Sequence, residues 1–91
     1  MVYLYVRHHV KDYASWREGF DMHAPARQAA GAVDEPLVLR DVNDPNEITV
    51  LLGWKDLPRA RAFAESISLK DAAQASGVLG PLEIRFLDST D

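Results

Sequence analysis

Four stretches of this chain alternate between apolar and mixed side chains, and that alternation limits the possible folds more than any other feature. Successive side chains of a strand point to opposite faces, so a period of two marks a strand with one buried face. The pattern occurs in VYLYVRHHV (2–10), LVLR (37–40), EITVLLGWK (47–55) and PLEIRFL (81–87). Between the second and third stretches, DVNDPNE has the Asn, Asp and Pro content of a hairpin turn. The sequence therefore predicts four strands.

The segment from Asp12 to Ala30 has the period of an amphipathic helix. Large or apolar side chains recur at steps of three and four, at Tyr13, Trp16, Phe20, His23, Arg27 and Ala30. Asp12 is a favourable N-cap, and Gly31 can end the helix in the left-handed conformation. Pro25 has no N–H to donate to the carbonyl of Asp21, so we expect a kink beside His23.

Further helices are expected after the third strand. One begins after Asp56, with apolar positions Leu57, Ala60, Phe63, Ala64 and Ile67. Ser68 can cap a short final helix, LKDAAQAS, which Gly77 closes. The order strand, helix, strand, strand, helix, strand predicts an α+β, ferredoxin-like βαββαβ plait, a four-stranded antiparallel sheet with its helices on one face. Because no linker or repeat divides the 91 residues, we expect a single domain, 1–91.

One face of this sheet is almost entirely hydrocarbon and must lie under the helices. On the first strand it carries Val2, Leu4, Val6, His8 and Val10, so His8 points inward and His9 outward. The outer face has an apolar patch formed by Tyr3, Tyr5, Val38, Leu51 and Leu87. Polar groups surround the patch, namely Arg7, His9, Arg40, Glu83 and Arg85. We expect a homodimer, sheet against sheet, with these groups paired across the subunits; a monomer with a solvated sheet is the alternative.

Charge and composition limit the kinds of partner that this chain can bind. A net charge of -4 without a run of Lys or Arg offers no surface for phosphate backbones, so no nucleic acid is expected. No apolar stretch approaches the ~20 residues of a membrane span, and no signal peptide is evident, so we expect no membrane association and a cytoplasmic location. Without cysteine, disulfides and thiolate catalysis are excluded. Because His8 and His9 point apart, we expect no metal site.

Three stretches together resemble the dimeric α/β-barrel superfamily, which includes antibiotic biosynthesis monooxygenases and small polyketide cyclases. They are VRHHVKDYASW, NDPNEITVLLGW and GPLEIRFL, and the resemblance runs over the whole chain. The resemblance implies a homodimer and, in each subunit, a pocket between sheet and helices for an aromatic or polyketide-like molecule. It also implies chemistry without a cofactor. Haem is not expected, because the second helix has no histidine to serve as an iron ligand.

Ionisable residues on the inward faces are the candidate catalytic set, formed by His8, His23 and Arg27. A neutral imidazole can take a proton from a phenol or an activated methylene, and an arginine can stabilise the resulting anion. The expected walls of the site are Trp16, Phe20, Trp54, Phe63 and Phe86. Direct contact between His8 and His23 is not expected, because they lie at different depths along the strand and the helix.

Each of these residues also has a structural interpretation. His8 can be a core histidine bonded to backbone or water, and His23 can bond the carbonyl that Pro25 frees. The guanidinium of Arg27 can lie at the surface while the aliphatic part of its side chain packs on the core. The aromatic residues can simply fill a small core. From the ionisable residues on the inward faces together with the family resemblance, we expect a cofactor-independent enzyme of the monooxygenase or cyclase type. The alternatives are a non-catalytic dimeric ligand-binding or accessory protein, and a scaffold with a filled core.

Overall fold

The computed structural model describes residues 1–65 and 78–90. Its elements follow in the order β1 (Val2–Val10), α1 (Tyr13–Met22), α2 (Ala24–Ala30), β2 (Ala32–Arg40), β3 (Glu47–Trp54), α3 (Leu57–Glu65) and β4 (Val78–Asp88). The short helix expected from Ser68, and the position of Ile67, lie outside the described residues.

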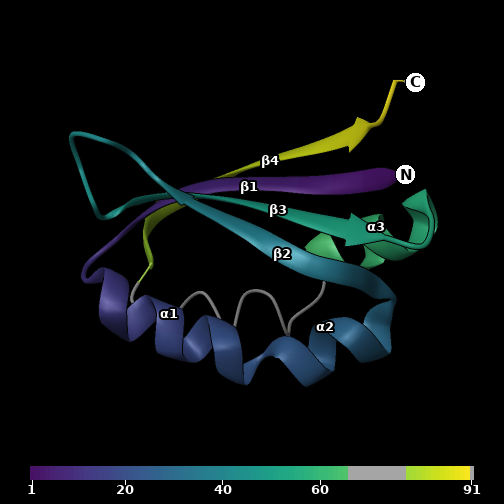
Figure 1. Ribbon diagram of the computed structural model, residues 1–91, viewed down its shortest axis with the longest axis horizontal. Helices are drawn as coiled ribbons and strands as arrows, with labels where there is room; N and C mark the ends of the chain where they lie inside the picture. Colours follow the sequence, from purple (N-terminus) through teal and green to yellow (C-terminus); the bar gives the residue numbers. More distant parts are fainter. Residues whose placement is uncertain (66–77, 91) are drawn as a thin grey trace.

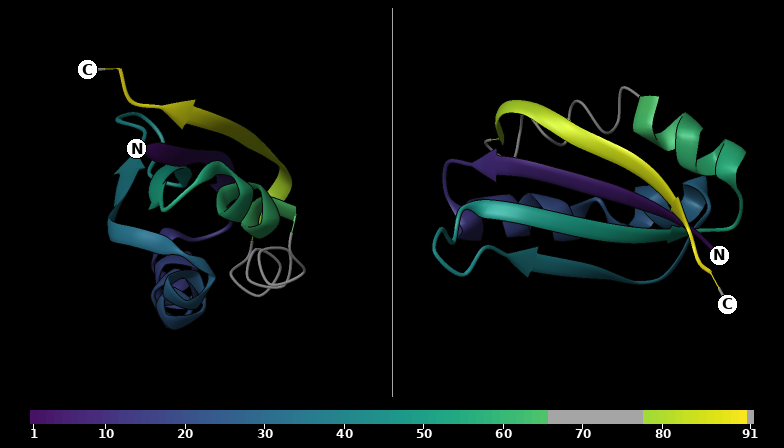
Figure 2. Two further views of the ribbon diagram at one scale, coloured as in Figure 1. Left: turned by 90° about the vertical axis from the view of Figure 1, so that its right-hand side faces the viewer. Right: turned by 90° about the horizontal axis from the view of Figure 1, so that it is seen from above.

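The four strands form one antiparallel sheet in the order β2-β3-β1-β4 (Figure 1). The helices lie on one side of this sheet, as the end-on and top views show (Figure 2). The ferredoxin-like plait predicted from the strand and helix order is therefore confirmed. No helix in the part of the chain that the structure describes is long and apolar enough to cross a membrane.

The long helix predicted from residue 12 to residue 30 is divided at His23 into α1 and α2, as the position of Pro25 indicates. The Asp12 carboxylate accepts a hydrogen bond from the Ser15 N–H at 3.0 Å, which caps α1. Gly31 ends α2 with φ of 114°, a left-handed conformation that costs glycine little. These local signals set the direction in which the helical layer crosses the sheet.

The second strand is longer than predicted, and this changes which face some residues occupy. It begins at Ala32 and contains an irregularity between Val33 and Leu37, where Asp34 has φ of 64°. β2 is an edge strand, where a bulge and Pro36 can be accommodated without a lost ladder bond. Residues 34–36 resemble a turn in the sequence, which is why the predicted strand started only at 37.

Two expected outer-face residues, Val38 and Arg40, lie on the inner face instead. Val38 pairs with buried Val50 and packs against the core, and Arg40 pairs with Ile48. The Arg40 guanidinium lies 4.0 Å from the centre of the Tyr13 ring, beside the start of α1. Their assignment to the outer patch and its polar rim was wrong, because the alternation was carried over a strand whose pairing partner was unknown. Leu37 and Leu39 occupy the outer face in their place.

The core lies between the inner face of the sheet and the helices. Its buried hydrophobic residues are Leu4, Val6, Val10, Trp16, Ile48, Val50, Leu52, Trp54, Ala60 and Phe63. Leu4, Val6 and Val10 lie at positions of the first strand that were predicted to be inward. Two polar residues, His8 and Arg27, are buried with them. The inward faces therefore hold ionisable groups inside hydrocarbon, which is the arrangement that a candidate site requires.

Candidate functional site

His8 is buried on the inner face of β1, inside the hydrocarbon core. Its side chain is 6 % exposed, and neither ring nitrogen has a hydrogen-bond partner among the residues that the structure describes. Burial lowers the pKa of His8 to about 4, and the Glu47 carboxylate only partly opposes this. The imidazole is therefore neutral near pH 7, with one nitrogen able to accept a proton. Unpaired buried polar groups are rare in proteins and need an explanation.

The sheet is irregular at the same point. On β4, Arg7 pairs with Glu83 and His9 pairs with Leu79, so two residues of β1 span four residues of β4. The extra length falls at Gly80 and Pro81, and proline cannot donate a ladder hydrogen bond. Bulges of this kind often lie next to functional sites. The Gly-Pro pair was a visible signal in the sequence, but it suggested only where the last strand begins.

A stack of rings runs from His8 along the helical layer. The centroids of the His8 and Trp16 rings lie 5.4 Å apart, and those of Trp16 and Phe20 lie 4.9 Å apart in a stacked arrangement. The Arg27 guanidinium carbon lies 3.8 Å from the centre of the Phe20 ring. Helical spacing places Trp16 and Phe20 on one face of α1. The structure thus brings together His8, Trp16, Phe20 and Arg27 of the predicted set.

Arg27 does not run to the surface, so that structural interpretation was wrong. It is 6 % exposed, and it donates a hydrogen bond of 2.8 Å from Nη1 to the carbonyl oxygen of Phe20. That carbonyl lies at the C-terminus of α1, where a cation is favourable. Burial lowers the pKa of Arg27, while Asp21 opposes the shift. The kink therefore places a buried positive charge at the far end of the ring stack.

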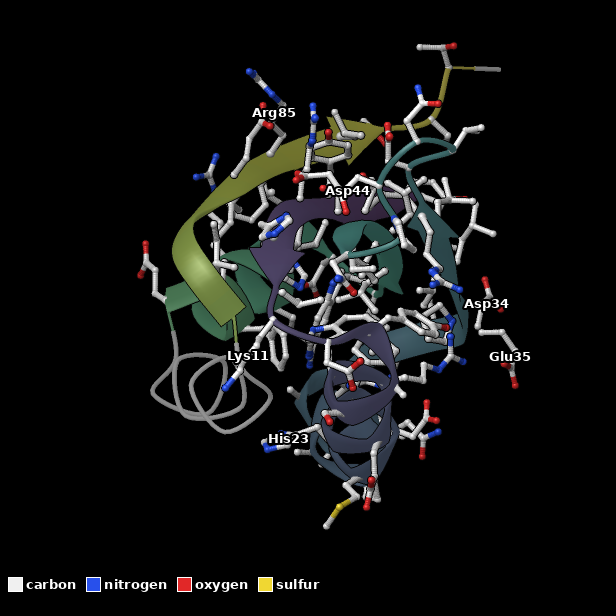
Figure 3. All side chains as sticks on the ribbon, turned by 90° about the vertical axis from the view of Figure 1, so that its left-hand side faces the viewer. Lys11, His23, Asp34, Glu35, Asp44 and Arg85 are labelled. Carbon is white, nitrogen blue, oxygen red and sulfur yellow. The ribbon has the colours of Figure 1, made fainter. Side chains whose placement is uncertain are left out.

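His23 occupies the junction between α1 and α2 and is half-buried. Its backbone N–H bonds the carbonyls of Gly19 and Phe20, both at 3.2 Å. Its ring lies at the side of the helical layer and does not point toward the sheet (Figure 3). The structure does not bring this ring to His8, which agrees with the expected lack of direct contact.

The other predicted wall residues lie away from His8. Trp54 pairs with Val2, and His8 pairs with Ile48, which separates Trp54 and His8 by about 20 Å along the sheet. Trp54 is 1 % exposed and packs 4.8 Å from Phe63 between centroids. Its Nε1 has no hydrogen-bond partner within the described ranges, a feature that sequence patterns do not reveal. Phe86 is half-buried under the guanidinium of Arg61, at 4.9 Å.

Polar groups on the outer face pair within one chain. Arg7 bonds Glu47 at 3.1 Å, His9 lies 3.3 Å from Glu47 and 3.5 Å from Asp44, and Arg85 bonds Glu83 at 3.3 Å. Arg85 and Asp44 project on the side of the sheet opposite the helices (Figure 3). One ligand atom each from His9, Asp44 and Glu47 lies within 4.8 Å of the others, a spacing that a divalent cation can use. The Arg7 guanidinium already neutralises the Glu47 carboxylate there.

Comparison with known proteins finds likeness in structure and none in sequence. No family model and no curated protein matches the chain. A Bordetella bronchiseptica protein assigned as an antibiotic biosynthesis monooxygenase superposes with a TM-score of 0.80 at 14% identity, over 98% of this chain and 96% of its own. SnoaB, a cofactor-independent oxygenase from Streptomyces nogalater, gives 0.77 at 18% identity, over 99% and 93%.

A third structure, assigned as an antibiotic biosynthesis monooxygenase from Caulobacter crescentus, has a TM-score of 0.75 at 17% identity and covers 99% of this chain and 90% of its own. The coverage is nearly complete in each case, so the likeness extends over the whole domain and not over one motif. At such identities it establishes the fold and leaves the chemistry to the site. The chain therefore has the same ferredoxin-like fold as these three structures.

Proposed function

We propose that this chain is a cofactor-independent small-molecule enzyme of the monooxygenase or cyclase type. Its substrate is a flat aromatic or polyketide-like molecule held between the sheet and the helices, and His8 accepts a proton from it. The observation that carries this proposal is the buried imidazole of His8, which has no hydrogen-bond partner among the described residues. The likeness to SnoaB, a cofactor-independent oxygenase, supports the reaction class.

A phenol or enol beside His8 provides the polar partner that the imidazole lacks. The neutral ring accepts the proton and becomes imidazolium, and the new anion raises the pKa of the ring through its opposite charge. Trp16, at 5.4 Å from His8 between centroids, provides an aromatic wall beside the imidazole. Proton transfer is therefore coupled to ligand binding.

The anion then reacts in one of two ways. In a monooxygenase it reduces O2 directly, so that a CH2 group and O2 give a carbonyl group and water. In a cyclase the carbanion forms a bond to a carbonyl carbon of the same molecule, and His8 returns its proton to the new alkoxide. Arg27 has a supporting role and contributes positive charge from the end of the ring stack, whereas the ring of His23 lies too far to the side to take part.

A panel of flat phenols and polyketide-like β-dicarbonyl compounds tests this function. We expect compounds that change the tryptophan fluorescence to be converted, with oxygen uptake for a monooxygenase or a product of altered mass but no oxygen uptake for a cyclase. Mass spectrometry and an oxygen electrode measure the two outcomes. Saturable binding without conversion of any bound compound contradicts the enzyme and favours the non-catalytic ligand-binding or accessory protein.

We also propose that the chain forms a homodimer through the outer face of its sheet. Exposed leucines lie there at Leu37, Leu39 and Leu87, and the half-buried side chains of Tyr3, Tyr5 and Leu51 lie between them. The charged pairs of Arg7 with Glu47 and of Arg85 with Glu83 border this apolar surface. An apolar patch with a charged border is typical of an interface that two-fold symmetry can close.

Analytical ultracentrifugation tests the dimer directly. At micromolar concentration the chain should sediment with the mass of two copies, and Leu51→Lys should reduce it to one because a charge would be buried in the interface. Met22→Lys is the matched control, since Met22 is an exposed apolar residue of the helical layer, on the other side of the sheet. A mass of one chain for the unmodified protein would contradict the proposal.

A further inference from the structure

A small hollow lies between α2 and the β2–β3 edge of the sheet, away from His8. Its empty space is about 30 Å³, enough for roughly two water-sized atoms. Its walls are mostly apolar, with Ala24, Ala32, Val33, Pro36 and Leu52 among them. The irregularity of β2 between Val33 and Leu37 forms one side of it. The hollow therefore exists because the edge strand bulges where α2 packs.

Arg27 lines this hollow and, among the described residues, uses only part of its hydrogen-bonding capacity. A guanidinium has five N–H donors, and the bond from Nη1 to the Phe20 carbonyl uses one of them. Among the described residues, no carboxylate forms an ion pair with Arg27, and Asp21 is instead held by Arg17 at 3.1 Å. A buried charge without an anionic partner is costly. The structure thus contains a buried cation beside an unfilled space.

The surroundings of the guanidinium favour an organic anion over an inorganic one. Phe20 covers one face of Arg27 at 3.8 Å, and the half-exposed Val33 and Pro36 offer apolar surface to the part of a ligand that lies outside the small space. Asp34 also borders the hollow, but its carboxylate points outward to solvent, as does that of Glu35 (Figure 3). The planar fork of arginine matches the two oxygens of a carboxylate. Two oxygen-sized atoms are also what the space admits.

We propose that this hollow binds the carboxylate of a small organic acid, with its two oxygens in the hollow on Arg27 and its apolar part outside it, against the half-exposed Val33 and Pro36 that line its open side. This site lies away from His8, and carboxylate binding there does not depend on the proposed enzymatic function, in which Arg27 contributes only distant charge. The geometry assigns Arg27 a ligand-binding role in addition to its bond with the Phe20 carbonyl.

Benzoate, acetate and inorganic phosphate are the probes, titrated into the full chain and followed by the ¹H–¹⁵N signal of the Arg27 Nε–H. Benzoate should saturate this signal at a concentration at least tenfold lower than acetate, and phosphate should leave it unsaturated. Arg27→Gln should abolish benzoate saturation, followed in that variant through the backbone amides of α2. Arg85→Gln changes an exposed arginine on the other side of the sheet and should leave benzoate saturation unchanged.

A second variant keeps the test valid if Arg27→Gln does not fold. Ala24→Leu places a larger side chain in the wall of the hollow without removing the bond from Arg27 to Phe20, and it should also abolish benzoate saturation. Benzoate binding that survives Ala24→Leu in a folded chain would overturn the site. Equal, unsaturated shifts with all three anions would show non-specific ion effects and would overturn it as well.

Discussion

His8→Gln should lower the turnover of an accepted substrate by about 10²- to 10⁴-fold, the usual contribution of a positioned general base. Glutamine keeps a polar group of similar reach but cannot accept and return a proton near neutral pH. Because neither ring nitrogen of His8 bonds a described residue, the substitution removes no visible hydrogen bond. Steady-state kinetics with a compound identified by the substrate panel measure the effect, and circular dichroism checks the fold.

His9→Gln is the matched control for this experiment. It changes the neighbouring histidine, whose ring lies on the outer face near Glu47 and Asp44. Its turnover should stay within about twofold of the parent, provided that sedimentation shows the same mass. Parent-like turnover by a folded His8→Gln chain would remove His8 from the mechanism and with it the proposed proton transfer.

Between pH 6.5 and pH 4 the free energy of unfolding should fall by about 3 kcal/mol because of His8 alone. The pKa of His8 is about 4 in the folded chain, against 6.5 in the unfolded one, so the unfolded state binds the proton more readily over this range. Acid therefore favours unfolding. The contribution of His8 is fully present above pH 6.5, is lost as the pH falls toward 4, and changes no further below pH 4.

Urea denaturation at pH 7, 5.5 and 4.5 measures this loss of stability. Carboxylates also titrate in this range, so they contribute to the measured pH dependence. Comparison with His8→Gln cancels the contribution of the carboxylates, because the variant retains every carboxylate of the parent. The parent should lose more stability than the variant over this range, and the difference between them reports His8. Identical pH dependence in the two chains would show that His8 is already paired in the folded state.

The elements that local patterns determine were predicted well. Asp12, Pro25 and Gly31 act on their own backbone or on their nearest turns, so the cap, the break at His23 and the left-handed end could be read from the chain. The inward position of His8 followed from alternation, because β1 is regular where it pairs with β3. Such signals do not depend on what the neighbouring strand does.

Prediction failed where the pairing of one segment with another decides the outcome. The bulge in β2 depends on its place at the sheet edge, and it moved Val38 and Arg40 to the inner face. The helical period put Arg27 on the inward face, but whether so long a side chain stays inside depends on the Phe20 ring and carbonyl that receive it. Similarly, the strand register decides that Trp54, with Phe63, lies far from His8 and that only some of the predicted aromatic residues lie near this histidine.

The sequence by itself determined the ferredoxin-like plait and the separation of the two adjacent histidines, because periods of two and of three to four residues are properties of a single strand or helix. Only the tertiary structure decided that His8 lacks a partner among the described residues and that Arg27 lies buried beside an open hollow. Hydrogen-bond pairing and empty space depend on groups distant in the chain, and no local pattern specifies them.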